Sequence, residues 1–324
     1  MSLKVGIVGT GYAAKKRAEA LQADERAELL AVTGNTPERI QDFCQTFAIS
    51  AVDSWQQLVS RSELDLIFVC TINRDCGAIA HAAISAGKHV VVEYPLATEP
   101  QLAADIIHLA ASKNKLLHIE HMELIGGLHQ TMKQNLPQIG KVFSARYTTI
   151  SPKHPVTQEW KYHREMFGFP LVAALSRIHR LTNLFGKVDT VSCQNRYWNT
   201  PNSPYFTACL CQAQLQFSND VIADITYGKG DVFWQAHRTF EINGEKGALL
   251  FEGETGTLIT AAGKTNLEVL SRRGLFAKDT TMVLDCLLEN KPLYLQPQDS
   301  LYTLQVAAAA RKSANTGKSI DLTM

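Results

Sequence analysis

The sequence of 324 residues contains no apolar run of the ~20 residues that a membrane-spanning helix needs. Its longest apolar segments, Leu64–Ile72 and His89–Tyr94, have the length of buried strands. The amino terminus shows no charged region, apolar region and cleavage site in succession, because a strand pattern already begins at Leu3. We therefore expect no secretory signal, no membrane partner and a cytoplasmic protein.

An excess of charge of one sign is also missing. The 32 Lys and Arg residues nearly balance the 31 Asp and Glu residues, which leaves a formal net charge of +1. Such a chain has no overall field that would favour nucleic acid or an anionic membrane. We expect no nucleic-acid partner, and any basic patch must be local.

Paired cysteines and histidines at metal-binding spacing are absent as well. The seven cysteines are an odd number, and several lie inside apolar patterns, which is typical of small core residues in a reducing compartment. Cys209 and Cys211 alternate along one predicted strand without a second pair. Glu120, His121 and Glu123 are too close in sequence to point at one ion. We expect no metal site.

The first third of the chain alternates strand and helix patterns joined by short loops. This order is typical of a parallel, doubly wound α/β sheet. The predicted helices include Ala13–Gln22, a helix that begins at Pro37, Ala78–Ala86 and Glu99–Lys113. The predicted strands are Leu3–Val8, Glu28–Thr33, Ala51–Val52, Leu64–Cys70, His89–Glu93 and Leu116–Ile119. Residues 1–121 are therefore expected to form one α/β domain.

Beyond residue 121 the pattern changes to longer strands separated by turn signals such as Asn243-Gly244. A helical region is predicted over 123–136 and a last helix over Ser300–Ala314. The predicted strands are Val142–Ile150, Val188–Trp198, Ala208–Phe217, Val221–Tyr227 and Thr239–Asn243. Residues 122–324 are expected to form a second, α+β domain with a large, mostly antiparallel sheet. No flexible linker separates the two, so the boundary is expected to be tight.

The segment from Val5 to Ala14 carries a G-x-G-x-x-A pattern between a strand and a helix. Gly9 permits the tight turn, Gly11 lets the backbone approach a pyrophosphate, and Ala14 keeps the helix close to the strand. The alternative is an ordinary strand-to-helix turn. The pattern predicts dinucleotide binding by Gly9, Thr10, Gly11, Tyr12 and Ala13.

The end of the second strand distinguishes the two nicotinamide dinucleotides. NAD enzymes usually place a carboxylate there, whereas Thr33–Thr36 is polar and neutral. Asn35 and Thr36 can donate hydrogen bonds to a 2′-phosphate, and Arg39 lies one turn further on. NADPH is therefore favoured as the cofactor, with NADH the weaker alternative. Three more basic residues either reach the phosphate or form a solvated helix face: Lys15, Lys16 and Arg17.

The stretch Ala86–Pro95, AGKHVVVEYP, resembles a signature of the glucose–fructose oxidoreductase/inositol dehydrogenase (Gfo/Idh/MocA) family. With the glycine pattern, it covers most of the first domain. The family's order, a Rossmann domain followed by an antiparallel sheet, also matches the whole chain. The resemblance implies an NAD(P)H-dependent oxidoreductase, and we expect Thr71 and Glu93, at two further strand ends, to contact the cofactor as well.

The chain departs from the sugar and polyol dehydrogenases of that family at the residues that carry their chemistry. Those enzymes have a catalytic lysine in the motif E-K-P, and Tyr94 stands in its place. They also carry an aspartate and a histidine on a later helix, where this chain has Val172 and Ser176. The acid and base groups for oxidising an alcohol are missing.

These departures together resemble biliverdin reductases, most closely the cyanobacterial form. The resemblance implies that NADPH delivers a hydride to the central methine carbon of biliverdin, a tetrapyrrole, while a pyrrole nitrogen gains a proton. A sugar or cyclitol dehydrogenase and a non-catalytic NADP-dependent sensor or regulator stay as alternatives. The matching segments are Glu93–Pro95, Glu120–Leu124, Phe167–Pro170, Ser176-Arg177 and Leu184–Gly186.

Four residues are the candidate catalytic groups. Arg177 and Arg180 are three positions apart and therefore share one helix face. Arg177 is expected to stabilise charge on the pigment, because a guanidinium is a poor acid, and a structural ion pair is the alternative for both arginines. Tyr94 is expected to pack or relay a proton, and His121 to order the nicotinamide pocket or relay a proton.

Further residues of the second domain are candidates for contacts with the pigment. At most two of five basic residues are expected to bind its propionates, namely two of Arg146, Lys229, Arg238, Arg272 and Arg273. Four aromatic residues are expected to form a wall for a flat pigment, part of the core or an oligomer interface: Trp160, Trp198, Phe233 and Trp234. Pairing through the second sheet would make the protein a homo-oligomer.

Overall fold

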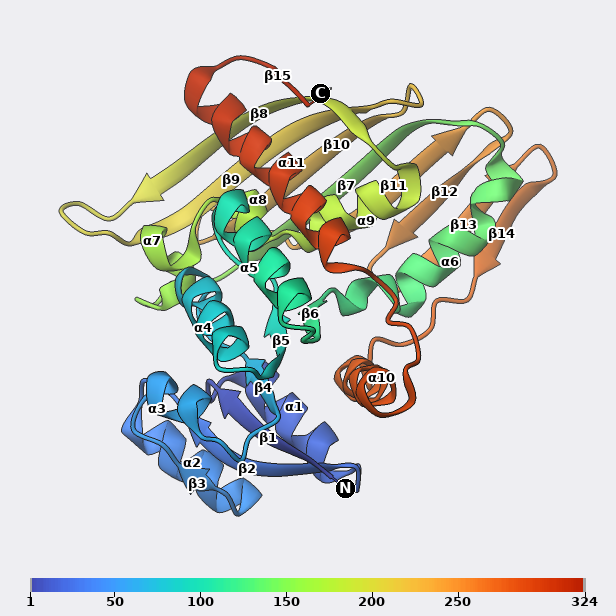
Figure 1. Ribbon diagram of the computed structural model, residues 1–324. Helices are drawn as coiled ribbons and strands as arrows, with labels where there is room; N and C mark the ends of the chain where they lie inside the picture. Colours follow the sequence, from blue (N-terminus) through green and yellow to red (C-terminus); the bar gives the residue numbers. More distant parts are fainter. Residues whose placement is uncertain (1, 323–324) are drawn as a thin grey trace. The chain divides into compact units, whose positions relative to one another are not determined.

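The computed structural model describes residues 2–322, which form two compact units. One unit comprises the residues up to Met122 together with Arg273–Leu301. The other comprises Glu123–Arg272 and the residues from Tyr302 onward. Figure 1 draws both units with the chain coloured along its sequence.

A parallel sheet forms the centre of the first unit. Its strand order is β3-β2-β1-β4-β5-β6, and each neighbouring pair is parallel. Because the order reverses between β1 and β4, the carboxyl ends of these strands border the crevice where doubly wound folds bind ligands. This confirms the predicted α/β class. The strands are β1 (Leu3–Val8), β2 (Ala27–Thr33), β3 (Ser50–Ala51), β4 (Leu66–Val69), β5 (His89–Glu93) and β6 (Leu117–Glu120).

The helices of the first unit pack apolar side chains against this sheet. Val5, Ile7 and Phe68 of the strands share one buried cluster with Ala14 and Leu21 of the first helix. The helices are α1 (Tyr12–Gln22), α2 (Pro37–Phe47), α3 (Trp55–Ser60), α4 (Asn73–Ser85), α5 (Pro100–Ser112) and α10 (Leu275–Glu289). Helix α10, which the sequence pattern did not indicate, packs against α1.

A buried ion pair explains why α10 belongs to the first unit. The Arg17 side chain on α1 is fully buried, and its Nη1 donates hydrogen bonds to Asp279 Oδ2 at 2.5 Å and to Thr280 Oγ1 at 3.0 Å. The Phe276 ring centroid lies 5.1 Å from the guanidinium carbon. The observed division therefore differs from the expected 1–121 and 122–324, because residues 273–301 supply the counter-charge for Arg17.

The second unit is built on a nine-stranded sheet of order β14-β13-β12-β11-β7-β10-β9-β8-β15. All neighbouring pairs are antiparallel except β7 and β10. The expectation of a mostly antiparallel sheet is thus confirmed. The strands are β7 (Val142–Pro152), β8 (Val188–Asn199), β9 (Phe206–Phe217), β10 (Ile222–Gly230), β11 (His237–Gly244), β12 (Gly247–Glu252), β13 (Thr255–Thr260), β14 (Gly263–Leu267) and β15 (Ile320–Asp321).

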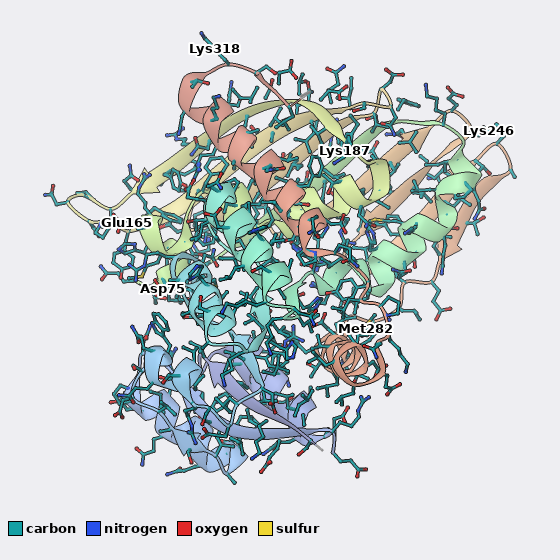
Figure 2. All side chains as sticks on the ribbon, viewed as in Figure 1. Asp75, Glu165, Lys187, Lys246, Met282 and Lys318 are labelled. Carbon is teal, nitrogen blue, oxygen red and sulfur yellow. The ribbon has the colours of Figure 1, made fainter. Side chains whose placement is uncertain are left out.

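Helices cover one face of this sheet, and the other face carries polar side chains. Along β9, every second residue from Cys211 to Phe217 is buried, whereas Gln212, Gln214 and Gln216 are exposed. Lys246, in the turn after β11, and Lys318, after the last helix, are exposed at the rim (Figure 2). The helical segments are η1 (Met122–Leu124), α6 (Gly127–Asn135), η2 (Leu136–Ile139), η3 (Trp160–Tyr162), α7 (Arg164–Phe167), α8 (Pro170–Ala173), α9 (Ser176–Phe185) and α11 (Pro297–Thr316).

Residues 2–322 lack both a membrane-spanning helix and a metal-binding cluster. None of the helices there is long and apolar enough to cross a membrane. Within the same residues, no group of three or more His, Cys, Asp or Glu side chains is arranged to hold a metal ion.

Candidate functional site

The turn between β1 and α1 has the geometry that a pyrophosphate requires. Gly9 has φ +119°, and a Cβ at this position would lie 2.1 Å from the carbonyl oxygen of Cys70, so only glycine fits. Gly11 precedes α1 without a side-chain cap, and a Cβ built on it would meet nothing within 4 Å. The backbone is therefore tight on one side and open at the helix amino terminus, where anions bind.

The end of β2 lies against this turn. A Cβ on Gly34 would lie 3.1 Å from Thr10 Cγ2, so the two predicted cofactor segments are close together. Asn35 and Arg39 are exposed and Thr36 is half-buried. These side chains are thus accessible to a 2′-phosphate that extends past the glycine turn.

Of the three further basic residues on α1, Arg17 is ruled out as a phosphate ligand. Its side chain is buried, and its Nε donates to Glu93 Oε1 at 3.0 Å in addition to its pairing with Asp279. Lys15 Nζ lies 2.9 Å from Asp42 Oδ2, and Lys16 Nζ lies 2.6 Å from Glu19 Oε2. Both lysines belong to the solvated helix face.

The remaining candidates of the first unit follow the carboxyl ends of β4, β5 and β6. Thr71 follows β4, which pairs with β1, and Glu93 ends β5, which pairs with β4. Both side chains are half-buried. The ring of Tyr94 stacks on that of His121, with centroids 5.1 Å apart and an interplanar angle of 5°. His121 is fully buried, and its Nε2 lies 2.9 Å from Ser300 Oγ. Two of the four predicted catalytic residues therefore meet in this unit.

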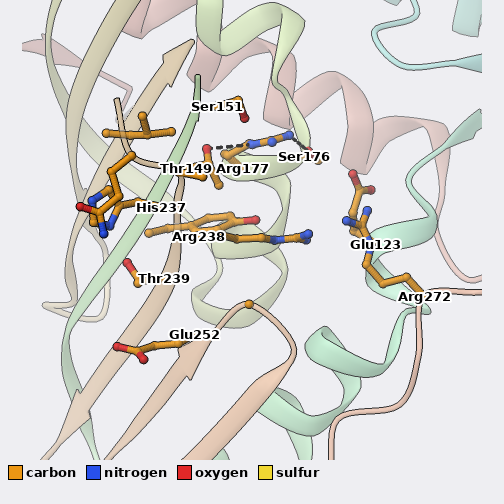
Figure 3. Close-up of a pocket in the computed structure, with 15 residues that line it drawn as sticks. Glu123, Thr149, Ser151, Ser176, Arg177, His237, Arg238, Thr239, Glu252 and Arg272 are labelled. Atoms are coloured by element: carbon orange, nitrogen blue, oxygen red, sulfur yellow. Dashed lines mark hydrogen bonds between the residues drawn. The ribbon is translucent and has the colours of Figure 1, made fainter. Parts of the chain in front are cut away.

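The second unit contains a pocket of about 660 Å³ that is lined by charged and polar side chains. Arg177 and Arg238 extend toward the side of the pocket on which Glu123 lies, as Figure 3 shows. Arg272 and Glu252 also line it. The pocket therefore concentrates guanidinium groups within reach of one ligand, and carboxylates suit such groups.

Hydroxyl groups and an aromatic ring hold Arg177. Its Nε donates to Thr149 Oγ1 at 3.3 Å and its Nη1 to Ser176 Oγ at 2.9 Å, the two bonds dashed in Figure 3. The guanidinium carbon lies 5.5 Å from the ring centroid of Tyr227. The side chain is half-buried, so its planar group is fixed in position and still borders the pocket.

Arg180, one turn further along α9, is not among the residues that line the pocket. It is 2% exposed, and within residues 2–322 its Nε and Nη1 have no hydrogen-bond partner. Its guanidinium carbon lies 5.9 Å from the ring centroid of Tyr147. Burial and, after it, the charge of Arg180 lower the pKa of His129 to about 3. The Arg180 charge is thus buried close to Tyr147, which lines the pocket.

The remaining basic candidates separate into two groups. Arg238 and Arg272 line the pocket and so remain candidates for binding the propionates. Arg146 and Arg273 are exposed and do not line it. Lys229 is buried, with Nζ 3.3 Å from the ring centroid of Phe167, and cannot reach a ligand in the pocket.

The four aromatic candidates do not line this pocket. Trp160 packs on Phe167, and Trp198 on Phe233, in edge or tilted contacts. Trp234 is 86% exposed and stacks on His154. Tyr147 also lines the pocket, although it was not among the predicted site residues. Its signal in the sequence is the alternation along β7, which places it on the same face as Thr149.

Two family models together match almost the whole chain. The model described as "Oxidoreductase family, NAD-binding Rossmann fold" matches residues 3–121, and "Oxidoreductase family, C-terminal alpha/beta domain" matches residues 133–322. A solved biliverdin reductase from Synechocystis sp. PCC 6803, in complex with biliverdin and NADP+, superposes with a TM-score of 0.95. The two chains are 50% identical, over 97% of this chain and 99% of that one.

Two curated relatives match shorter regions. Mouse biliverdin reductase A is 28% identical over 193 residues, which are 58% of this chain and 60% of that protein. A dTDP-3,4-didehydro-2,6-dideoxy-alpha-D-glucose 3-reductase from Actinomadura kijaniata is 30% identical over 161 residues, which are 47% of each chain. This chain thus spans about half to three fifths of these relatives. The glycine turn, the two units and both family models lead to one conclusion: this chain belongs to the Gfo/Idh/MocA oxidoreductase family, with its NAD-binding Rossmann domain and C-terminal α/β domain.

Proposed function

We propose that this protein is an NADPH-dependent biliverdin reductase. The observation that carries the proposal is the 50% identity, over almost the full length of both chains, to the Synechocystis enzyme solved with biliverdin and NADP+. The arginine-lined pocket of the second unit supports it, because biliverdin carries two propionates. So does the replacement of the catalytic lysine of the sugar enzymes by Tyr94.

The cofactor would be held by groups that fit it. The open space at Gly11 suits the pyrophosphate, and Asn35, Thr36 and Arg39 suit a 2′-phosphate. Thr71, Glu93, Tyr94 and His121 would border the nicotinamide, together with the backbone around Thr10, Tyr12 and Ala13. When bound, NADPH supplies the hydride of the reaction.

The second unit would bind and polarise the pigment. Arg238 and Arg272 pair with propionates, and Arg177 stabilises negative charge that develops on the ring system as the hydride arrives. Arg180, whose guanidinium lies close to the ring of Tyr147, adds to the positive charge near the pigment. Reducing a methine carbon involves no alcohol, so the chemistry needs no counterpart of the lysine and histidine that the sugar enzymes carry.

Location and assembly complete the proposal. A cytoplasmic location agrees with seven cysteines that are all free thiols. We also propose a homo-oligomer that pairs through the open face of the second sheet, where β9 exposes Gln212, Gln214 and Gln216.

The test is a spectral assay with purified protein. Biliverdin is mixed with the protein and NADPH, and in parallel with NADH, while the visible spectrum is followed. We expect the blue-green band to decline as a yellow bilirubin band grows, and NADPH to be used faster. A spectral shift on binding without turnover would instead indicate an NADP-dependent sensor.

The second candidate is a dehydrogenase of sugars or cyclitols. The relative from Actinomadura kijaniata favours it, because that protein reduces a nucleotide-linked sugar by name. The same preparation is therefore incubated with NADP+ or NAD+ and a set of cyclitols and hexoses. Formation of NADPH or NADH there, with no change in biliverdin, would replace the first proposal by the second.

A further inference from the structure

We propose that Tyr147 is the proton donor to the pyrrole nitrogen of the bound pigment. This inference rests on the proposed function and adds a residue to it. It assigns the protonation step to a phenol in the second unit, whereas the arginines beside it bind and stabilise charge.

The position of Tyr147 on β7 is the first support. The residue lines the pocket, although its side chain is only 3% exposed. Its ring packs on Phe240 of β11, with centroids 4.7 Å apart. Within residues 2–322 no group hydrogen-bonds to its hydroxyl, so the hydroxyl is available to a ligand in the pocket.

The charges around Tyr147 are the second support. Burial by itself raises the pKa of this phenol, but the guanidinium groups of Arg180, Arg177 and Arg238 together bring the pKa below its usual value. They come from two elements, α9 and β11. Glu123 opposes them, and His129 is neutral because burial lowers its pKa to about 3.

Three other tyrosines of the same unit, one buried and two half-buried, behave in the opposite way. Burial raises the pKa of Tyr162 to about 12, and it also raises the pKa of Tyr197 and of Tyr227. Tyr147 is therefore the phenol on which positive charge is focused. A phenol with a reduced pKa matches a proton-transfer step better than a guanidinium, whose pKa exceeds ~12, or an aliphatic hydroxyl such as that of Thr149.

The step balances as follows. The hydride from NADPH forms a new C–H bond at the central methine carbon, and the displaced π electron pair moves through the conjugated system to a pyrrole nitrogen. That pair forms an N–H bond with the hydroxyl proton of Tyr147, whose O–H bond breaks. The phenolate that remains is stabilised by Arg180 and Arg177 and regains a proton from water.

The substitution Tyr147→Phe tests this role, because it removes the hydroxyl and keeps the ring against Phe240. We expect kcat for biliverdin to fall by about 100-fold or more, the usual contribution of a general acid, with KM nearly unchanged. In the wild type, kcat should decline at high pH as the phenol ionises, and this decline should be missing in the variant. The matched control is Tyr197→Phe, a half-buried phenol outside the pocket, which should keep wild-type kcat and pH profile.

Two measurements without turnover complete the test. In an ultraviolet difference titration of the protein alone, one tyrosine should ionise below the usual phenol pKa in the wild type and in Tyr197→Phe. This ionisation should be missing in Tyr147→Phe. Biliverdin binding, followed by its visible spectrum, should persist in all three proteins.

The outcomes separate this inference from the proposed function. If the wild type reduces biliverdin and Tyr147→Phe does so at the same rate with the same pH profile, Tyr147 is not the donor and the reductase assignment stands. If the wild type itself fails to reduce biliverdin, the proposed function fails, and this inference fails with it.

Discussion

Arg17 illustrates what a single buried charge requires of its surroundings. Its guanidinium lies between the rings of Phe68 and Phe276 and is neutralised by Asp279 and Glu93. Burial raises the pKa of Asp279, but the charges of Arg17 and His118 and their hydrogen bonds lower it well below its ordinary value. Both members of the pair are therefore ionised at neutral pH.

Breaking this pair should destabilise the protein strongly. Asp279→Asn leaves Arg17 charged, buried and only partly compensated, which typically lowers the free energy of unfolding by about 3–5 kcal/mol. Urea denaturation, followed by circular dichroism, measures the loss. The double variant Arg17→Met, Asp279→Leu should recover most of it, because it removes both members of the buried pair and leaves only the half-buried Glu93 without its arginine. Equal loss in both variants would show that shape, and not charge, is what α10 needs.

Lys229 presents the opposite case, a buried amine without a carboxylate partner among the contacts that surround it. Burial lowers its pKa to about 7, whereas an unfolded lysine titrates near ~10.4. Between these two values the unfolded chain binds the proton and the folded chain does not. The free energy of unfolding therefore rises with pH across this range: it is highest above about pH 10 and falls as the pH drops toward 7.

Replacing this lysine should remove the pH dependence. We expect Lys229→Met to unfold at higher urea concentration than the wild type at pH 7, with the difference shrinking by up to about 1.4 kcal/mol per pH unit toward pH 10. Chemical denaturation at several pH values measures this. Parallel stability curves for the two proteins would show that the amine is already protonated in the folded state.

At the scale of an element, the two glycines of the turn between β1 and α1 should affect different properties: Gly9 the stability of the fold, and Gly11 the binding of NADPH. Gly9→Ala forces a Cβ into the carbonyl of Cys70 at positive φ, so we expect lower thermal stability and no NADPH binding. Gly11→Ala meets open space at an ordinary φ, so we expect wild-type stability and NADPH affinity reduced about tenfold or more. Thermal unfolding and fluorescence titration measure both properties. Undiminished affinity in Gly11→Ala would place the pyrophosphate elsewhere.

The elements that the sequence revealed are those with strong local signals. β1, β2 and β5 are short apolar runs bounded by turns, and α2 begins at Pro37 as its signal indicated. Strands β12 to β14 lie in a segment with weak alternation, since β14 carries mostly exposed side chains. Their strand structure comes from pairing in the sheet, which no local pattern encodes.

The same distinction applies to the candidate site. The glycine motif and Arg177 could be found from sequence, because a turn before a helix and an arginine in a recognisable segment are local features. Tyr147 could not, because the three arginines that act on its pKa come from two elements that are distant in sequence. Lys229 and Arg17 could be dropped as candidates only with the structure, since packing determines which charges become buried.

At the scale of the molecule, the residues proposed to bind the nucleotide lie in the first unit, and the arginines proposed to act on the pigment lie in the second. Arg177→Ala should therefore slow biliverdin reduction strongly while NADPH binding survives. We expect kcat to fall by about 100-fold or more, as for the loss of one charge-stabilising group. Steady-state assays and NADPH titration measure the two effects. The control is Arg196→Ala, an exposed arginine of the second unit, and normal turnover in Arg177→Ala would overturn the role of the pocket.

Because residues 273–301 belong to the first unit, this unit cannot be completed early during protein synthesis. Arg17 leaves the ribosome 262 residues before Asp279. At typical rates of synthesis, this separation corresponds to roughly 10–50 s during which Arg17 has no Asp279 to pair with. The nucleotide-binding unit therefore completes itself only after most of the second unit has been translated. A chimera that exchanges this unit between relatives must carry both of its segments, and a fragment that stops at residue 122 would keep an arginine with half of its counter-charge missing.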